Sequence, residues 1–121
     1  MDREQAIRVI AQAVHETIRA YQGALGQTRA PAWDEAGEMQ KWSIDAVELA
    51  LAAPTPGAQH DAWVASKLRD GWRWGPSKDV AQKTHPSLVP FDELPQDEKN
   101  KDTILIAIVQ TLSTVLAVSP G

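Results

Sequence analysis

The sequence of 121 residues contains no cysteine, and it has no long uninterrupted apolar run. Without cysteine, disulfide bonds and thiolate metal sites are excluded. The most apolar segment, 103–118, is broken by Gln110 and by threonine and serine, and it is shorter than the roughly 20 residues that cross a bilayer. We therefore predict no membrane span, and the charged start of the chain favours an intracellular, cytoplasmic location.

Positive charge and catalytic motifs are scarce as well. Lys and Arg number 12 against 16 Asp and Glu, so the formal net charge is −4, which disfavours binding to long DNA or RNA. The chain has no phosphate-binding Gly-rich loop, no dinucleotide fingerprint and no nucleophilic serine motif, and its histidines lack the spacing of metal ligands. We expect no enzymatic activity, no metal and no cofactor.

Apolar residues recur at helical spacing in most of the chain. The periodicity predicts helices over 3–25 and 36–52, a third from near 58 to Asp70-Gly71, and a fourth after Leu94-Pro95. Between the last two, Gly and Pro rule out a regular helix. The expected fold is a mostly α single domain, 1–121, with at most a short strand near 72–74.

Two pairs of segments resemble each other within the chain. "WDEAGEMQK" (33–41) matches "FDELPQDEK" (91–99), and "VHETIRAY" matches "QHDAWVAS" less fully, through His15 and His60. We infer a degenerate duplication of a helix–loop–helix unit, 1–57 and 58–118, packed about a pseudo-twofold. His15 and His60 could form a general acid–base pair if both faced one cleft, but we interpret them as hydrogen-bonding a loop of the partner unit.

The fourth predicted helix carries more apolar residues than one buried face requires. Ile106 and Val118 are expected to lie off the broad face, which favours a homodimer. The apolar residues of that face are Ile104, Leu105, Ile108, Val109, Leu112, Val115 and Leu116.

The loop 71–90 concentrates the unusual chemistry of the sequence. An extended "WRW" would send Trp72 and Trp74 to the same face, so both would lie in the core or both would line a cleft. Lining a cleft, they would stack on a nucleotide base, and basic side chains nearby would bind its phosphates. The alternatives are a solvated loop, an ion pair between Lys83 and Asp79, and a structural turn at 84–86. The candidate ligand-binding residues are Trp72, Arg73, Trp74, Lys78, Asp79, Lys83, His85 and Tyr21.

The same region closely resembles the ryanodine receptor repeat domain over roughly 58–116. The motifs that carry the resemblance, in order, are His60-x-x-Trp63, Gly71-Trp72-x-Trp74-Gly75-Pro76, Asp79, Lys83-Thr84-His85-Pro86, Leu88-Val89-Pro90-Phe91-Asp92-x-Leu94-Pro95 and Lys99. The chain departs from the family in lacking a tyrosine near Trp74 and Phe91. The resemblance implies a mostly helical fold of paired units with a short strand.

What the resemblance implies about function is a binding role. Such domains occur in calcium-release channels, where they are associated with adenine nucleotides and subunit contacts, and in small proteins of bacteria and their viruses. Those small proteins look like sensors or sequestering proteins for nucleotide signals in conflict between cells and phages. We therefore expect a non-catalytic binder of a small adenine-containing or cyclic nucleotide. The alternative is a protein–protein interaction module, favoured by the apolar fourth helix and the acidic segment 92–102.

Overall fold

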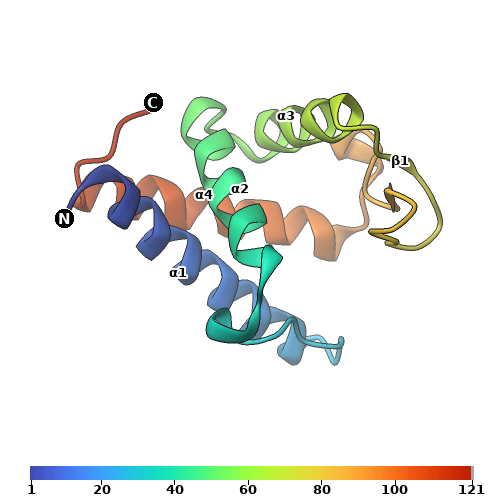
Figure 1. Ribbon diagram of the computed structural model, residues 1–121, viewed down its shortest axis with the longest axis horizontal. Coiled ribbons are helices and arrows are strands. Elements are labelled where there is room, and N and C mark those ends of the chain that lie inside the picture. The colour runs from blue at the N-terminus through green and yellow to red at the C-terminus, as the bar shows by residue number, and fades with distance from the viewer. Residues whose placement is uncertain (121) are drawn as a thin grey trace.

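The computed structural model describes residues 1–120, and within them the fold is mostly helical, as predicted (Figure 1). The helices are α1 (Arg3–Ala24), α2 (Glu38–Ala52), α3 (Pro56–Arg69) and α4 (Gln96–Val115). Short 3₁₀ turns, η1 (Trp33–Glu35) and η2 (Phe91–Glu93), precede α2 and α4. A parallel pair of two-residue strands, β1 (Arg73–Trp74) and β2 (Thr84–His85), lies between α3 and α4. The sequence indicated β1 but not β2, which falls where a turn was expected.

Local chemistry explains where the helices begin and end. Asp2 starts α1 with a capping box, because its carboxylate accepts from the Gln5 N–H while the Gln5 side chain accepts from the Asp2 N–H. The Thr55 hydroxyl caps α3, and Pro56 occupies the first helical position, so α3 begins two residues before the expected Ala58. Helix α2 begins at Glu38 rather than at residue 36, because η1 and a left-handed Gly37 (φ 57°) come first.

The apolar core lies where α1, α2 and α4 pack together. Ile106 is buried in this core, although its spacing predicted a position off the apolar face. Helix α3 differs, because its only buried residues are Gln59 and His60. The core residues are Ile7, Ile10, Ala11, Val14, Trp33, Val47, Ala50, Leu105, Ile106 and Val109. The buried apolar residues between α3 and α4 come from the loop instead, namely Trp72, Leu88 and Leu94.

Helix α4 runs through the molecule with most of its apolar side chains at least partly covered. Only Val115, at 72% exposure, is a large apolar side chain of α4 left exposed. No helix in residues 1–120 has both the length and the apolar character needed to cross a membrane. The described ends of the chain lie on the same side of the molecule (Figure 1), where the Arg3 guanidinium donates to the Ser119 carbonyl at 3.0 Å.

His15 and His60 have matching surroundings. The Nε2 atom of His15 lies 2.6 Å from the Pro31 carbonyl oxygen, and that of His60 lies 2.7 Å from the Val89 carbonyl oxygen. Each carbonyl lies two residues before the aromatic residue that opens a 3₁₀ turn. The histidines thus bind the loop that follows their own helix, so the expectation that they bind the partner unit's loop is wrong. The duplication itself stays a prediction, which superposing α1–α2 on α3–α4 would test.

Candidate ligand-binding site

The end of α3 places a tryptophan over a lysine. Gly71 has a φ of 88°, its N–H donates to the Leu68 carbonyl, and the Trp72 N–H donates back to the Lys67 carbonyl at 2.9 Å. This is a Schellman motif, which commonly brings the side chains of these outer positions into contact. Accordingly, Lys67 Nζ lies 4.7 Å from the centre of the Trp72 ring. Trp72 is only 8% exposed, so its ring is buried rather than open to solvent.

The two tryptophans of the loop do not share one environment. Trp74 is 56% exposed, whereas Trp72 is buried, so the expectation of a shared face is wrong. The reason is that Trp72 still belongs to the helix end and only residues 73–74 are extended. Gly75 then permits the close pairing of β1 and β2, because a Cβ atom there would lie 2.6 Å from Thr84 Cβ.

Two lysines converge on a third tryptophan, Trp42 of α2. Lys78 Nζ lies 4.4 Å from the centre of the Trp42 ring, and Lys67 Nζ lies 5.2 Å from it. Neither ammonium forms an ion pair with any carboxylate in residues 1–120. Burial lowers the pKa of both lysines, and the charge of Lys67 lowers the pKa of Lys78 further. An anion bound between these ammonium groups would relieve their repulsion.

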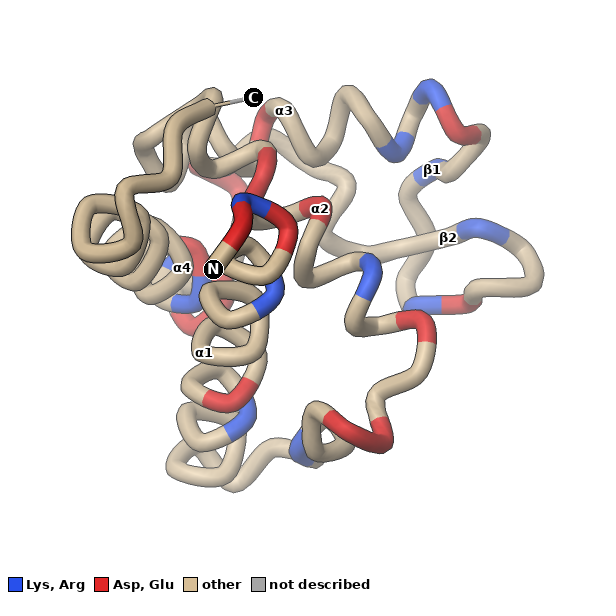
Figure 2. The backbone as a smooth tube through the Cα atoms, turned by 60° about the vertical axis from the view of Figure 1, so that its left-hand side comes forward, with Lys and Arg blue, Asp and Glu red and all other residues tan. Residues whose placement is uncertain are grey.

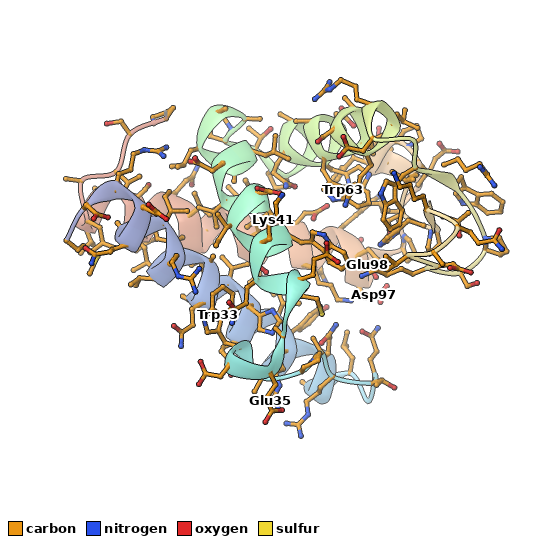
Figure 3. All side chains as sticks on the ribbon, in the orientation of Figure 1. Trp33, Glu35, Lys41, Trp63, Asp97 and Glu98 are labelled. Atoms are coloured by element: carbon orange, nitrogen blue, oxygen red, sulfur yellow. The ribbon has the colours of Figure 1, made fainter. Side chains whose placement is uncertain are left out.

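A cleft of about 300 Å³ opens beside this cluster. Trp42, Trp63 and His85 line it at the end near the loop, and Val14, Ile18 and Leu105 supply apolar wall. Figure 3 shows Trp63 on the side of α3 that faces α4 and the loop. The cleft therefore combines aromatic surface with neighbouring cations, which is the composition expected of a small-molecule site.

His85 lies at the centre of this arrangement. Its ring makes an edge contact with Trp63, with 5.1 Å between centroids. Burial, together with the charges of Lys78, Lys67 and His60, lowers the pKa of His85 to about 4. The ring is consequently neutral near pH 7. Its Nδ1 accepts from the Ser87 N–H at 3.0 Å, so the ring hydrogen is on Nε2, which is left as a donor.

The remaining predicted site residues lie apart from the cleft lining. Arg73 and Trp74 are exposed on β1, and Lys83 Nζ donates to the Asp70 carbonyl at 2.9 Å. Asp79 accepts from the Gln82 N–H, and Tyr21 accepts from the Asn100 side chain of α4. Figure 2 shows charges of both signs along the loop around β1 and β2. Of the eight predicted residues, only His85 lines the cleft, and Lys78 and Trp72 lie in the neighbouring lysine cluster. A ligand-binding role for all eight stays a prediction.

Sequence reasoning missed Trp42, Trp63 and Lys67 as site residues. Trp63 belongs to the His60-x-x-Trp63 motif, which was a signal for it. Lys67 could have been found from the helix stop at Gly71, because the Schellman motif fixes its position relative to Trp72. Nothing near Trp42 in the sequence indicates that α2 faces the loop, since that contact depends on how the helices pack.

The histidines do not form a shared catalytic centre. His15 lines the cleft described above, whereas His60 lines a second cavity. Within residues 1–120, no group of three or more His, Asp or Glu side chains gathers as metal ligands would. The arrangement offers ammonium groups, aromatic surface and a neutral imidazole side by side.

A comparison with protein families gives a match to the model described as the RyR domain, over residues 40–119. The match covers most of the chain and includes α2, the loop and α4. It is longer than the 58–116 segment that the motifs indicated, because it takes in most of α2. The helix that carries Trp42 is thus part of the matched region.

Proposed function

The chain belongs to the RyR domain family, and we propose that it binds a small phosphorylated nucleotide, adenine-containing or cyclic, without converting it. The observation that carries the proposal is the pair of ammonium groups, Lys67 and Lys78, held against Trp42 without a carboxylate partner. Lys78 is exposed and Lys67 is partly buried, and two like charges beside one aromatic ring favour the binding of an anion. A phosphate group supplies that anion.

The neighbouring cleft supports a base next to the phosphate. Trp42 and Trp63 both line it, and stacking of a base on an aromatic side chain contributes roughly 1–3 kcal/mol. The negative net charge of −4 does not oppose this, because a single phosphate group responds to the local cluster rather than to the whole surface. The ligand would extend from the lysines into the cleft.

The groups that line the cleft support binding without turnover. His85 is neutral, and its Nδ1 is used by the Ser87 N–H. A nucleophile hydrogen-bonded to a base is the usual minimum for covalent catalysis. The hydroxyl of Ser43 in the cleft has no hydrogen bond to His15 or His85 in residues 1–120. The protein would then sense the nucleotide or sequester it, and a role in conflict between bacteria and phages is the setting that the family suggests.

The first test is a thermal-shift screen of the full chain against mono-, cyclic and ADP-ribose-type nucleotides. A ligand at 100 times its Kd stabilises the folded state by about 2.7 kcal/mol, which raises the melting temperature measurably. The same ligand should quench tryptophan fluorescence by stacking in the cleft. If no nucleotide shifts the melting temperature or the fluorescence, the proposal fails.

A protein-interaction role is the second candidate. It is favoured by the exposed apolar side chains of the loop, Trp74 at 56% and Val80 at 48% exposure. Aromatic residues on exposed loops are typical anchors of protein interfaces. Failure of the nucleotide screen, together with loss of a purified partner when Trp74 is changed to Ala, would favour this candidate.

A further inference from the structure

A carboxylate next to the cleft lacks the hydrogen bonds that buried carboxylates require. Asp102 of α4 has one oxygen, Oδ2, buried without any hydrogen-bond partner, and it is the only such buried side-chain atom in residues 1–120. The other oxygen, Oδ1, also has no hydrogen bond, but it is not buried. The Asp102 side chain as a whole is 20% exposed. Buried polar groups are nearly always paired, so this arrangement calls for an explanation.

The polar side chain that faces the buried oxygen is His60. Because a carbonyl oxygen only accepts, the contact of His60 Nε2 with the Val89 carbonyl at 2.7 Å places the ring hydrogen on Nε2. In the neutral ring, Nδ1 is then an acceptor, and it faces Asp102 Oδ2 at 3.7 Å. This distance is too long for a hydrogen bond, so the carboxyl group of Asp102 is not paired with the ring. Burial, together with the charge of Glu98, raises the pKa of Asp102 to about 7, which is consistent with a proton on Oδ2.

A pocket of about 190 Å³ lies in front of this pair. We call it the inner pocket, and its lining includes His60, Asp102, Trp63, His85 and Glu98. Trp63 and His85 also line the cleft, so the two cavities adjoin at these residues. Glu98 is already paired with Lys101 at 3.3 Å. Asp102 Oδ1 has no such partner, so it is a free acceptor at the inner pocket.

The inner pocket also offers a donor. His85 Nε2 carries the ring hydrogen and has no hydrogen-bond partner within residues 1–120. This nitrogen is not fully buried. The pocket thus presents an acceptor, Asp102 Oδ1, and a donor, His85 Nε2–H. Adenine presents the complementary pair, an amino group beside a ring nitrogen acceptor, whereas hypoxanthine presents an oxo group beside a ring N–H.

We infer that the inner pocket reads the edge of the base, with Asp102 Oδ1 accepting from an exocyclic amino group and His85 Nε2 donating to the adjacent ring nitrogen. This inference rests on the proposed nucleotide function and adds the group that selects the base. His60 is a positioning residue, because its ring lies 3.7 Å from Oδ2 and covers that side of the Asp102 carboxyl group. The lysines bind the phosphate end, and the base stacks on Trp63, which lines both the cleft and the inner pocket.

The test is isothermal titration calorimetry of AMP and IMP, which carry the same phosphate and sugar and differ only at this edge of the base. The wild-type chain should prefer AMP by about tenfold or more, as expected for one well-made pair of hydrogen bonds to a base. Asp102→Asn should keep the preference, because the amide nitrogen can donate to His60 Nδ1 while the amide oxygen faces the pocket. Asp102→Leu should remove the preference, and Asp61→Leu, an exposed acid of α3, should leave it unchanged.

The ratio of the two affinities is measured within each variant, so it does not depend on how much of a variant is folded. Equal binding of AMP and IMP to the wild type would overturn the inference while leaving the proposed function intact. A preference for AMP that survives Asp102→Leu would also overturn it. Absence of binding by both nucleotides would remove the proposed function and this inference together.

Discussion

The Lys78 ammonium lies 4.4 Å from the centre of the Trp42 ring, although the two residues belong to the loop and to α2. This contact ties the long loop to the three-helix core. The Lys67 ammonium contacts the same ring, with 5.2 Å between Nζ and the ring centre. Cation–π attraction favours holding both ammonium groups beside the ring, and a bound anion would reduce the repulsion between them.

The two loop tryptophans should contribute very differently to stability. Trp72→Ala removes a buried indole next to the end of α3, so we expect a loss of roughly 3–5 kcal/mol in the free energy of unfolding. Trp74→Ala changes an exposed side chain and should stay within about 0.5 kcal/mol of the wild type. Urea denaturation of both variants measures the difference. Equal losses would contradict the burial of Trp72 and the exposure of Trp74.

Gly75 should tolerate no side chain. A Cβ atom there would lie 2.6 Å from Thr84 Cβ, so Gly75→Ala must separate β1 from β2 and should cost roughly 1–3 kcal/mol, as overpacking does. Gly57→Ala is the matched control, because its Cβ would meet Phe91 at an ordinary 3.8 Å on a helix. We expect the control to be neutral or stabilising. Similar melting temperatures for both variants would argue against the observed strand pairing.

The pH dependence of stability should reveal two opposed titrations. Because the pKa of Asp102 is raised to about 7, its stabilising contribution is present at low pH and is lost as pH rises through 7. The pKa of His85 is lowered to about 4, so its contribution is present above about 6.5 and is lost as pH falls towards 4. Between pH 4 and 6.5 the two residues change the free energy of unfolding with pH in opposite directions, so their slopes cancel in the wild type.

Single variants should uncover each slope. In Asp102→Asn, the free energy of unfolding should rise with pH over this window relative to the wild type, by up to about 1.4 kcal/mol per pH unit. In His85→Gln, it should fall by a similar amount per pH unit. Urea denaturation at several pH values measures both. His60, Glu98 and Lys101 surround Asp102, while Lys67 and Lys78 lie near His85, and all remain in both variants. Parallel pH profiles for the three proteins would contradict the assigned pKa shifts.

The homodimer remains a prediction, and the surface available for it on α4 is narrower than the sequence indicated. Val115 is its only large apolar side chain left exposed in residues 1–120. If α4 forms the interface, light scattering at tens of micromolar should give twice the 13.2 kDa chain mass, and Val115→Glu should halve it. Val80→Glu, an equally apolar exposed site on the loop, should not. A wild-type mass of one chain would reject the dimer.

The helices and the family could be predicted from the sequence because both depend on local signals. Gly26 and Gly71 stop helices where their left-handed φ values place them, and the motifs around the loop indicated the family that residues 40–119 match. The environments of individual side chains could not be predicted in the same way. The prediction that Trp72 and Trp74 share a face was wrong, because the Schellman motif at the end of α3 fixes the position of Trp72.

The candidate site was predicted only in part for a similar reason. The loop contributed Lys78 and His85, which were expected, but the surfaces that they face come from α2 and α3. Ile106 shows the same limit in the core, where packing of α1 against α4 buries a residue that simple periodicity placed elsewhere. Such contacts depend on helix packing angles, which one sequence does not specify.

The most direct test of the nucleotide-binding claim is calorimetry of the strongest ligand from the screen with three proteins. The wild type should bind, and Lys78→Met should weaken binding roughly 10- to 100-fold, as expected for a hydrogen bond to a charged group, while keeping the apolar contact with Trp42. Lys41→Met makes the same charge change at an exposed lysine of α2 that pairs with Asp45, and it should bind like the wild type. Equal affinities for all three proteins, or no heat with any nucleotide, would contradict the account.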